Sequence, residues 1–226
     1  MTTTLKQYAG RILLALFALF MAPHAAVAVP LTFEGVTGGL NDYVEVSIPA
    51  HGSTPAFSSS GDEQVGFATY QAGSGPLTYS FCMDPYDPSI AKTENYTAVS
   101  LTAGPESSLG SVAMGSSAAV TIEKLWAMNY SAAQTSITAA AALQVAIWKA
   151  VAESQGGTVT AVEYENQANE MLVDTVSYQG GVPPLFAWSN NHYQDYIGVP
   201  DGGVTAALLG LSLAGVAMLR RKYHHA

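Results

Sequence analysis

The chain has 226 residues and a formal net charge of −9 at pH 7. This length is enough for one large domain or two small ones. Between residues 29 and 199 there are three lysines, no arginine and sixteen acidic residues, a formal charge of −13. Because phosphate binding needs clustered Lys and Arg, this composition argues against nucleic acid as a partner.

Residues 1–28 have the features of a secretory signal peptide. Lys6 and Arg11 supply a positive region, residues 12–21 are apolar, and Ala26-Val27-Ala28 fits the A-x-A cleavage pattern. The alternative, a membrane anchor, is less favoured because the apolar segment is short for a transmembrane span. We therefore expect a cleaved signal and an exported protein.

The first half of the remaining chain has the texture of a strand-rich region. Between residues 35 and 120, short apolar or alternating runs are separated by Gly, Ser, Thr and Pro, which is typical of strands and turns. The candidate strands are residues 43–48, 65–71, 77–83 and 96–102. No internal repeat is visible. Residues 29–198 are enough for one core of ordinary size and are expected to form one domain.

Helical patterns begin near residue 118. Three helices are expected, at residues 120–130, at the alanine-rich residues 138–153 and at residues 162–178. The third is predicted to bury Tyr164, Ala168, Met171, Leu172 and Val176. Residues 185–198 are expected to form a final strand or an irregular segment. Strands followed by helices favour an α+β fold, with a sandwich-like or barrel-like strand-rich part and a subdomain of about three helices.

Cys82 is the only cysteine, so it cannot form an internal disulfide. A lone cysteine in an exported protein remains a thiol, pairs with another molecule or enters some other bond. Cys82 lies in an aromatic, strand-like run at residues 79–84, and the run Leu-Gln-Val-Ala-Ile-Trp at residues 143–148 follows within the alanine-rich helix. This second run offers the side-chain amide of Gln144 as a partner for the sulfur.

Phe81-Cys82-Met83-Asp84 is similar to the aromatic-Cys motif in the thioester domains of Gram-positive surface adhesins. Residues 143–148 resemble the second motif of these domains, and the resemblance spans about residues 77–198. It departs at Leu143, where the family usually has Thr. The resemblance implies a thioester between Cys82 and Gln144 that captures amines covalently, for adhesion or biofilm attachment. Such capture happens once per molecule, so no enzymatic turnover is expected.

Aromatic side chains are candidates to keep water away from this bond. Phe81 is next to the cysteine, Trp126 lies on the preceding helix, and Trp148 shares a helix face with Gln144. Asp84 either orients a nearby donor or caps a turn. Taken singly, each of these residues is more often an ordinary core or turn residue. No cofactor or metal is expected, because the sequence has no spacing typical of such sites.

The end of the chain has a three-part tail. Val199-Pro200-Asp201-Gly202-Gly203 precedes the apolar residues 204–219 and the basic cluster Arg220-Arg221-Lys222. This tail resembles the PEP-CTERM class of sorting signals, in its VPDSG-like variant. The resemblance implies an exosortase-type protease as a partner and transient membrane contact through residues 204–219. It also implies a Gram-negative bacterium, passage through the inner membrane, and a final place at the cell surface or in the extracellular matrix. An ordinary single-span tail anchor is the alternative.

A second function remains open at this point. The domain would then be a noncovalent matrix-binding or carbohydrate-binding module without a reactive bond. In that case exposed aromatic rings, such as Trp188, Tyr193 and Tyr196, would stack on sugar faces.

Overall fold

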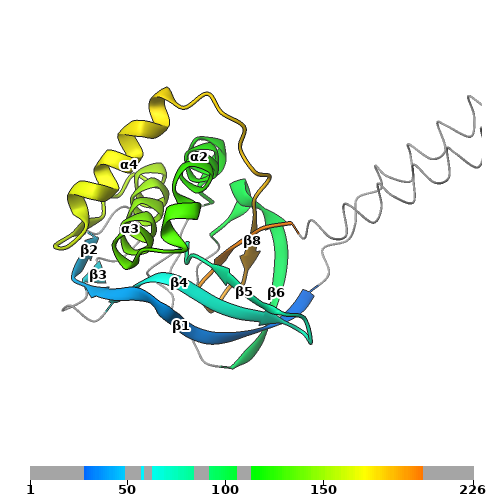
Figure 1. The fold of residues 1–226 in the computed structure, drawn as a ribbon. Coiled ribbons are helices and arrows are strands. Elements are labelled where there is room, and N and C mark those ends of the chain that lie inside the picture. Colours follow the sequence, from blue (N-terminus) through cyan, green and yellow to red (C-terminus); the bar gives the residue numbers. More distant parts are fainter. Residues whose placement is uncertain (1–27, 49–56, 59–62, 84–91, 106–112, 201–226) are drawn as a thin grey trace, which may run out of the picture.

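A computed structural model describes residues 28–48, 57–58, 63–83, 92–105 and 113–200 (Figure 1). Almost all of the expected signal peptide, Asp84 and the tail from Asp201 to the basic cluster lie outside these residues. Among the helices within the described ranges, none is long and apolar enough to cross a membrane.

The main element is a six-stranded sheet whose neighbouring strands are all antiparallel, in the order β5-β4-β1-β6-β8-β9. Its strands are β1 (Ala28–Val44), β4 (Glu63–Ala72), β5 (Leu77–Ser80), β6 (Thr93–Ser100), β8 (Phe186–Ser189) and β9 (Tyr196–Gly198). The register of β1 against β4 shifts between Phe33 and Gly35 and again between Val36 and Asn41. Such irregularities bend a strand and increase its twist. The sheet accordingly curls into a half-barrel (Figure 1).

A smaller sheet joins the strands that follow β1 to the segment between α3 (Ile137–Ser154) and α4 (Glu165–Ser177). It contains β2 (Val46–Ile48), β3 (Phe57–Ser58) and β7 (Thr160–Ala161), with β2 in the middle. The Val162 amide also donates to the Glu45 carbonyl, at 3.1 Å. These contacts attach the segment before the last helix to the strand region.

The helical layer contains α2 (Gly115–Ala133), α3 (Ile137–Ser154) and α4 (Glu165–Ser177), after a short 3-10 turn, η1 (Leu101–Ala103). α3 begins where Ser136 accepts a hydrogen bond from the Ala139 amide, at 3.2 Å, as an N-cap residue does. It ends before Gly156, whose φ of 81° suits glycine. α3 contacts β1 and β4 on one side and both other helices on the other. It is therefore the central helix of the core (Figure 1).

The α+β, strand-rich fold is confirmed, with three helices in the described part. Some details differ from the sequence prediction. Residues 43–48 do not form one strand, because β1 ends at Val44 and β2 belongs to the other sheet. Val176 was expected to be buried but is 80% exposed, because the inward face of α4 includes Ala168 and Thr175 instead.

The third helix also begins later than predicted. Tyr164 adopts the left-handed conformation, with φ of 61°, and the helix starts after it at Glu165. The Tyr164 hydroxyl donates to the carboxylate of Asp42 on β1. This long-range contact holds a backbone conformation that a local helical pattern cannot reveal.

Candidate functional site

Cys82 lies where the two edges of the curled sheet meet. The chain continues past β5 and forms an isolated antiparallel bridge between Cys82 and Tyr196 of β9. Ile197 donates its amide to the Phe81 carbonyl at 3.0 Å, and Met83 donates to the Asp195 carbonyl at 2.9 Å. Since these flanking residues make the bonds to β9, the N–H and C=O of Cys82 itself point to the opposite side.

The side chain of Gln144 fills that opposite side. The Cys82 amide donates to Gln144 Oε1 at 3.0 Å, and Gln144 Nε2 donates to the Cys82 carbonyl at 2.7 Å. A carboxamide offers the same donor and acceptor as a peptide group, so Gln144 takes the place of a neighbouring strand. Cys82 is 4% exposed and Gln144 1%. The structure thus brings the two residues of the sequence hypothesis into direct contact.

Local sequence explains why each residue reaches this point. Gln144 lies in the middle of α3, whose residues from Ala140 to Ala152 are all buried. Small alanine side chains let the helix approach the sheet closely and favour helix formation. A polar side chain at such a position needs hydrogen-bond partners, and the backbone N–H and C=O of Cys82 supply them.

An aromatic cluster is built around Phe81, the residue before Cys82. The ring of Phe81 lies 5.8 Å from Trp126, edge to face, and 4.6 Å from Phe67. Trp126 in turn stacks on Tyr130 at 4.3 Å. Phe81 and Trp126 are both buried. Phe81 and Trp126, two of the side chains expected to exclude water, therefore pack against each other.

Trp148, the third expected aromatic residue, is buried one helical turn after Gln144. Residues four apart on a helix are neighbours on one face. Asp84, the remaining supporting residue of the sequence hypothesis, lies outside the described residues.

The sequence prediction missed a group of polar residues beside Cys82. Tyr96 donates its hydroxyl to the Gln194 carbonyl at 3.2 Å, and the Asp195 carboxylate, 1% exposed, accepts from the Asn190 amide at 2.8 Å. Burial raises the pKa of the Tyr96 hydroxyl, and the nearby Asp195 and Cys82 raise it further. Tyr96 is therefore a neutral donor at physiological pH. No local sequence pattern marks Asn190, Gln194 or Asp195 as neighbours of Cys82, because strand pairing brings them there.

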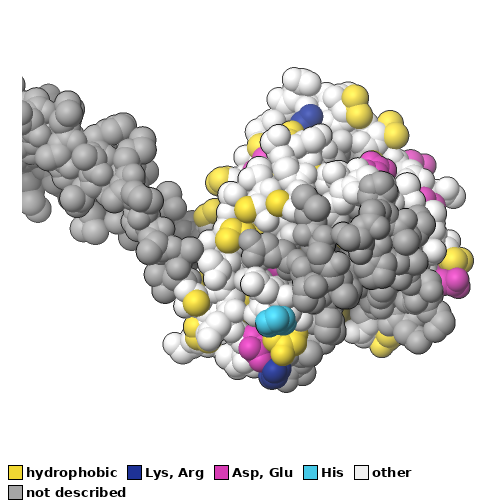
Figure 2. Space-filling view, turned by 180° about the vertical axis from the view of Figure 1, so that it is seen from behind, with side chains coloured by type: hydrophobic (Ala, Val, Ile, Leu, Met, Phe, Trp, Pro, Cys, Tyr) yellow, Lys and Arg dark blue, Asp and Glu magenta, His cyan; other side chains and the backbone are white. Residues whose placement is uncertain are grey.

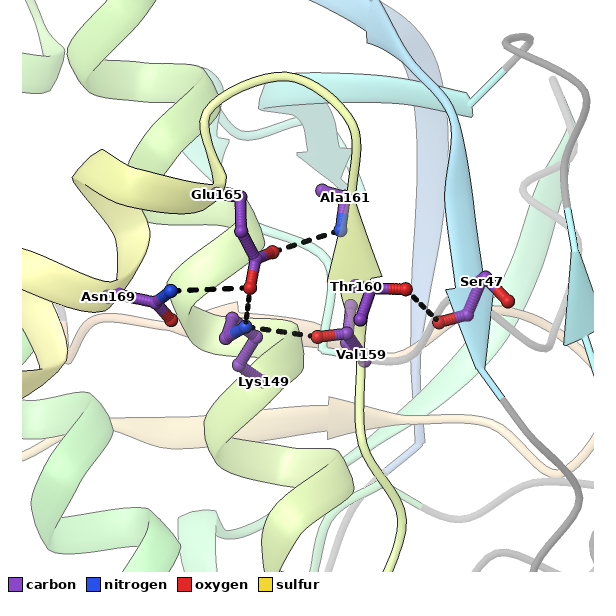
Figure 3. A network of polar contacts seen from close by, with 7 residues as sticks. All are labelled: Ser47, Lys149, Val159, Thr160, Ala161, Glu165 and Asn169. Atoms are coloured by element: carbon purple, nitrogen blue, oxygen red, sulfur yellow. Dashed lines mark hydrogen bonds and ion pairs between the residues drawn. The ribbon is translucent and has the colours of Figure 1, made fainter.

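A second polar cluster lies on the other side of α3 (Figure 3). The buried Lys149 donates to the Val159 carbonyl at 3.0 Å and forms an ion pair with Glu165. The same carboxylate accepts from the Ala161 amide at 3.0 Å and from Asn169 at 3.3 Å. Lys149 belongs to α3, Ala161 to β7 and Glu165 to α4, so the cluster fastens α4 and β7 to α3.

A metal site is not evident within the described ranges. There, no three side chains of His, Cys, Asp or Glu gather as a metal site would require. A shallow pocket of about 190 Å³ between the helices is lined by Ser117, Thr121, Glu153 and Leu172, among others, and includes neither Cys82 nor Gln144.

The carbohydrate-binding alternative predicted that Trp188, Tyr193 and Tyr196 would be exposed, and the structure corrects this prediction. Tyr196 is buried, at 1% exposure, and stacks on Phe33 with ring centroids 5.6 Å apart. Trp188 is half-buried and donates its indole N–H to the Tyr70 hydroxyl at 3.0 Å. Tyr193 is half-buried beside the Lys92 ammonium, 4.9 Å from its ring centroid. On the face seen in Figure 2, apolar side chains are scattered rather than gathered in one patch.

The comparisons with known proteins concern the tail. The VPDSG-CTERM motif matches residues 198–223, which confirms the predicted PEP-CTERM-like sorting signal. Its first residue, Gly198, is the last residue of β9. Neither the curated proteins nor the solved structures gave a match. The chain thus carries a signal of the kind recognised by exosortases, typical of secreted, surface-sorted proteins.

Proposed function

We propose that this protein is a secreted, surface-sorted domain in which Cys82 and Gln144 condense to a thioester that captures amines covalently. The observation that supports this most is the pair of hydrogen bonds between the Gln144 carboxamide and the backbone of Cys82. They hold the carbonyl carbon of the amide beside the residue that carries the thiol. Adhesion or attachment to an extracellular matrix is the role that such capture serves.

The closing step is an acyl transfer. The Cys82 sulfur attacks Cδ of Gln144, a C–S bond forms, the C–N bond breaks, and the amide nitrogen leaves as ammonia with the thiol proton. Held geometry of this kind can contribute about 7–11 kcal/mol to lowering a barrier. The Cys82 amide, 3.0 Å from Oε1, stabilises the negative charge that develops on that oxygen.

Burial supports the survival of the product. A thioester reacts with water as well as with amines, so a long-lived bond needs a dry surrounding. Cys82, Gln144, Phe81 and Trp126 are all buried. An incoming amine, such as a lysine side chain of a matrix component, would attack the carbonyl, form an amide to Gln144 and restore the Cys82 thiol. The reaction ends there, so the protein is a single-use binder rather than an enzyme.

A noncovalent binding module is the competing function. Its supporting observation is that Gln144 is explained without chemistry, as a buried side chain that satisfies the backbone of Cys82. In this alternative the contact stabilises the fold, and binding would occur elsewhere on the surface.

Intact mass of the exported protein decides between the two. We expect it to be lighter than the sequence mass by one ammonia, and methylamine to add its own mass while exposing a titratable thiol. Both Cys82→Ala and Gln144→Glu should abolish the methylamine adduct, whereas Gln134→Glu at an exposed position should retain it. Full sequence mass together with a titratable thiol in freshly purified, amine-free protein would falsify the thioester.

A further inference from the structure

Trp148 has a buried donor that the structure does not use. Among the buried side-chain atoms of the described residues, its Nε1 and the hydroxyl of Ser189 have no hydrogen-bond partner. Ser189 lies on β8, whereas Trp148 lies on the helix that carries Gln144. An indole N–H can only donate, and leaving it unpaired in the core costs stability. A phenylalanine would fill much of the same space without that cost, so packing alone does not account for the tryptophan.

The position of Trp148 relates this donor to Gln144. The two residues are four apart on α3 and share a helix face. Side chains of a helix lean toward its N-terminus, which directs the indole toward the turn that contains Gln144. Gln144 Oε1 accepts one bond, from the Cys82 amide. A carbonyl oxygen has two lone pairs, so Oε1 can accept a bond from a second donor.

The proposed thioester chemistry creates the demand for that donor. When a nucleophile adds to Cδ of Gln144, Oε1 changes from a carbonyl oxygen to an oxyanion. Sites of acyl transfer stabilise such an oxygen with preorganised donors. A donor that has no partner in the ground state and forms its hydrogen bond only in the transition state lowers the barrier most. The energy of that bond then stabilises the transition state alone and not the ground state.

We propose that the indole N–H of Trp148 is the second donor to the Gln144 oxyanion, beside the amide of Cys82. This role rests on the proposed thioester function. It operates in both directions: when Cys82 expels ammonia from Gln144, and when an amine expels Cys82 from the thioester. Trp148 is then a catalytic group of a single-use reaction rather than only an aromatic wall.

The test replaces the N–H without changing the ring shape. Trp148→benzothienylalanine exchanges the indole N–H for sulfur in the full exported chain, and Trp188→benzothienylalanine is the matched control, since its N–H bonds to Tyr70. The rate of methylamine capture is followed by intact mass, and the unfolding midpoint by circular dichroism. Loss of one oxyanion donor slows acyl transfer by about 100- to 1000-fold.

The two substitutions should separate rate from stability. We expect the Trp148 variant to capture methylamine at least about 100-fold more slowly, with no fall in its unfolding midpoint. We expect the Trp188 variant to have a lower unfolding midpoint and an unchanged rate of methylamine capture. A Trp148 variant that folds normally but keeps full sequence mass also supports the role, because closure passes through the same oxyanion. A wild-type rate in that variant overturns the donor role alone. Wild-type protein without a thioester overturns the proposed function and the donor role together.

Discussion

Gln144 is the residue on which the interpretation of the site depends, because its carboxamide pairs with a backbone as a strand would. Its bonds of 3.0 and 2.7 Å satisfy both polar groups of Cys82. An amide that reacts with Cys82 and an amide with a purely structural role would both make these two bonds. The energy of these hydrogen bonds can be measured apart from the covalent bond, by removing the sulfur first.

We predict that Gln144→Leu, introduced into a Cys82→Ala background, lowers the free energy of unfolding by about 2–6 kcal/mol. The leucine removes both hydrogen bonds that residue 144 makes to the buried backbone N–H and C=O of residue 82, and each loss costs about 1–3 kcal/mol. Chemical denaturation compares the double variant with Cys82→Ala alone. Gln134→Leu in the same background, at an exposed position, should change stability by no more than about 0.5 kcal/mol. Equal effects of the two leucines would contradict the structural role of Gln144.

Sequence motifs were sufficient to pair Cys82 with Gln144, because both lie in short runs of distinctive residues. They were not sufficient for the surroundings. Tyr196 reaches Cys82 through strand pairing between distant segments, and no local pattern encodes which strands meet. The unpaired indole N–H of Trp148 likewise depends on what packs around it. The covalent step itself stays a prediction.

At the scale of elements, α3 connects the candidate site to the second polar cluster. Gln144 points from this helix to the sheet, while Lys149 bonds to Val159 and pairs with Glu165 on α4. Sequence predicted α3 well, since its alanine content and terminal glycines are local signals. The start of α4 was predicted less well, because the left-handed Tyr164 is held by a contact with distant Asp42.

The ion pair makes the attachment of α4 sensitive to acid. Burial alone would raise the pKa of Glu165, but the bonds from Lys149 and the Ala161 amide outweigh it, so this pKa lies below its ordinary value of 4.5. A carboxylate with a lowered pKa in the folded state contributes stability above its unfolded pKa. That contribution disappears as the pH falls through the folded pKa.

We therefore predict that Glu165→Gln flattens the loss of stability between neutral pH and about pH 3. The measurement is the free energy of unfolding by urea at a series of pH values. Glu170→Gln, an exposed position on the same helix, is the control and should follow the wild-type profile. If Glu165→Gln and wild type lose stability in parallel on acidification, the ion pair does not carry the dependence.

For the whole molecule, the sorting signal and the site share one strand. β9 contributes Tyr196 to the bridge at Cys82 and ends at Gly198, where the VPDSG-CTERM match begins. Phe186 on β8 lies so close to Gly198 that a side chain there would collide with its ring. The signal thus begins at the end of a packed strand.

A covalent link between residues 82 and 144 would also brace the entire domain. Closing a loop of this length stabilises a fold by about 4 kcal/mol in the chain-entropy treatment used for disulfides. We predict that methylamine, which opens the link, lowers the free energy of unfolding of the wild-type protein by about that amount, measured by chemical denaturation after mass spectrometry has shown complete opening. Cys82→Ala treated in the same way controls for general effects of the amine and should not change. Complete opening without loss of stability would mean that residues 82 and 144 are held as firmly by their hydrogen bonds as by the bond itself.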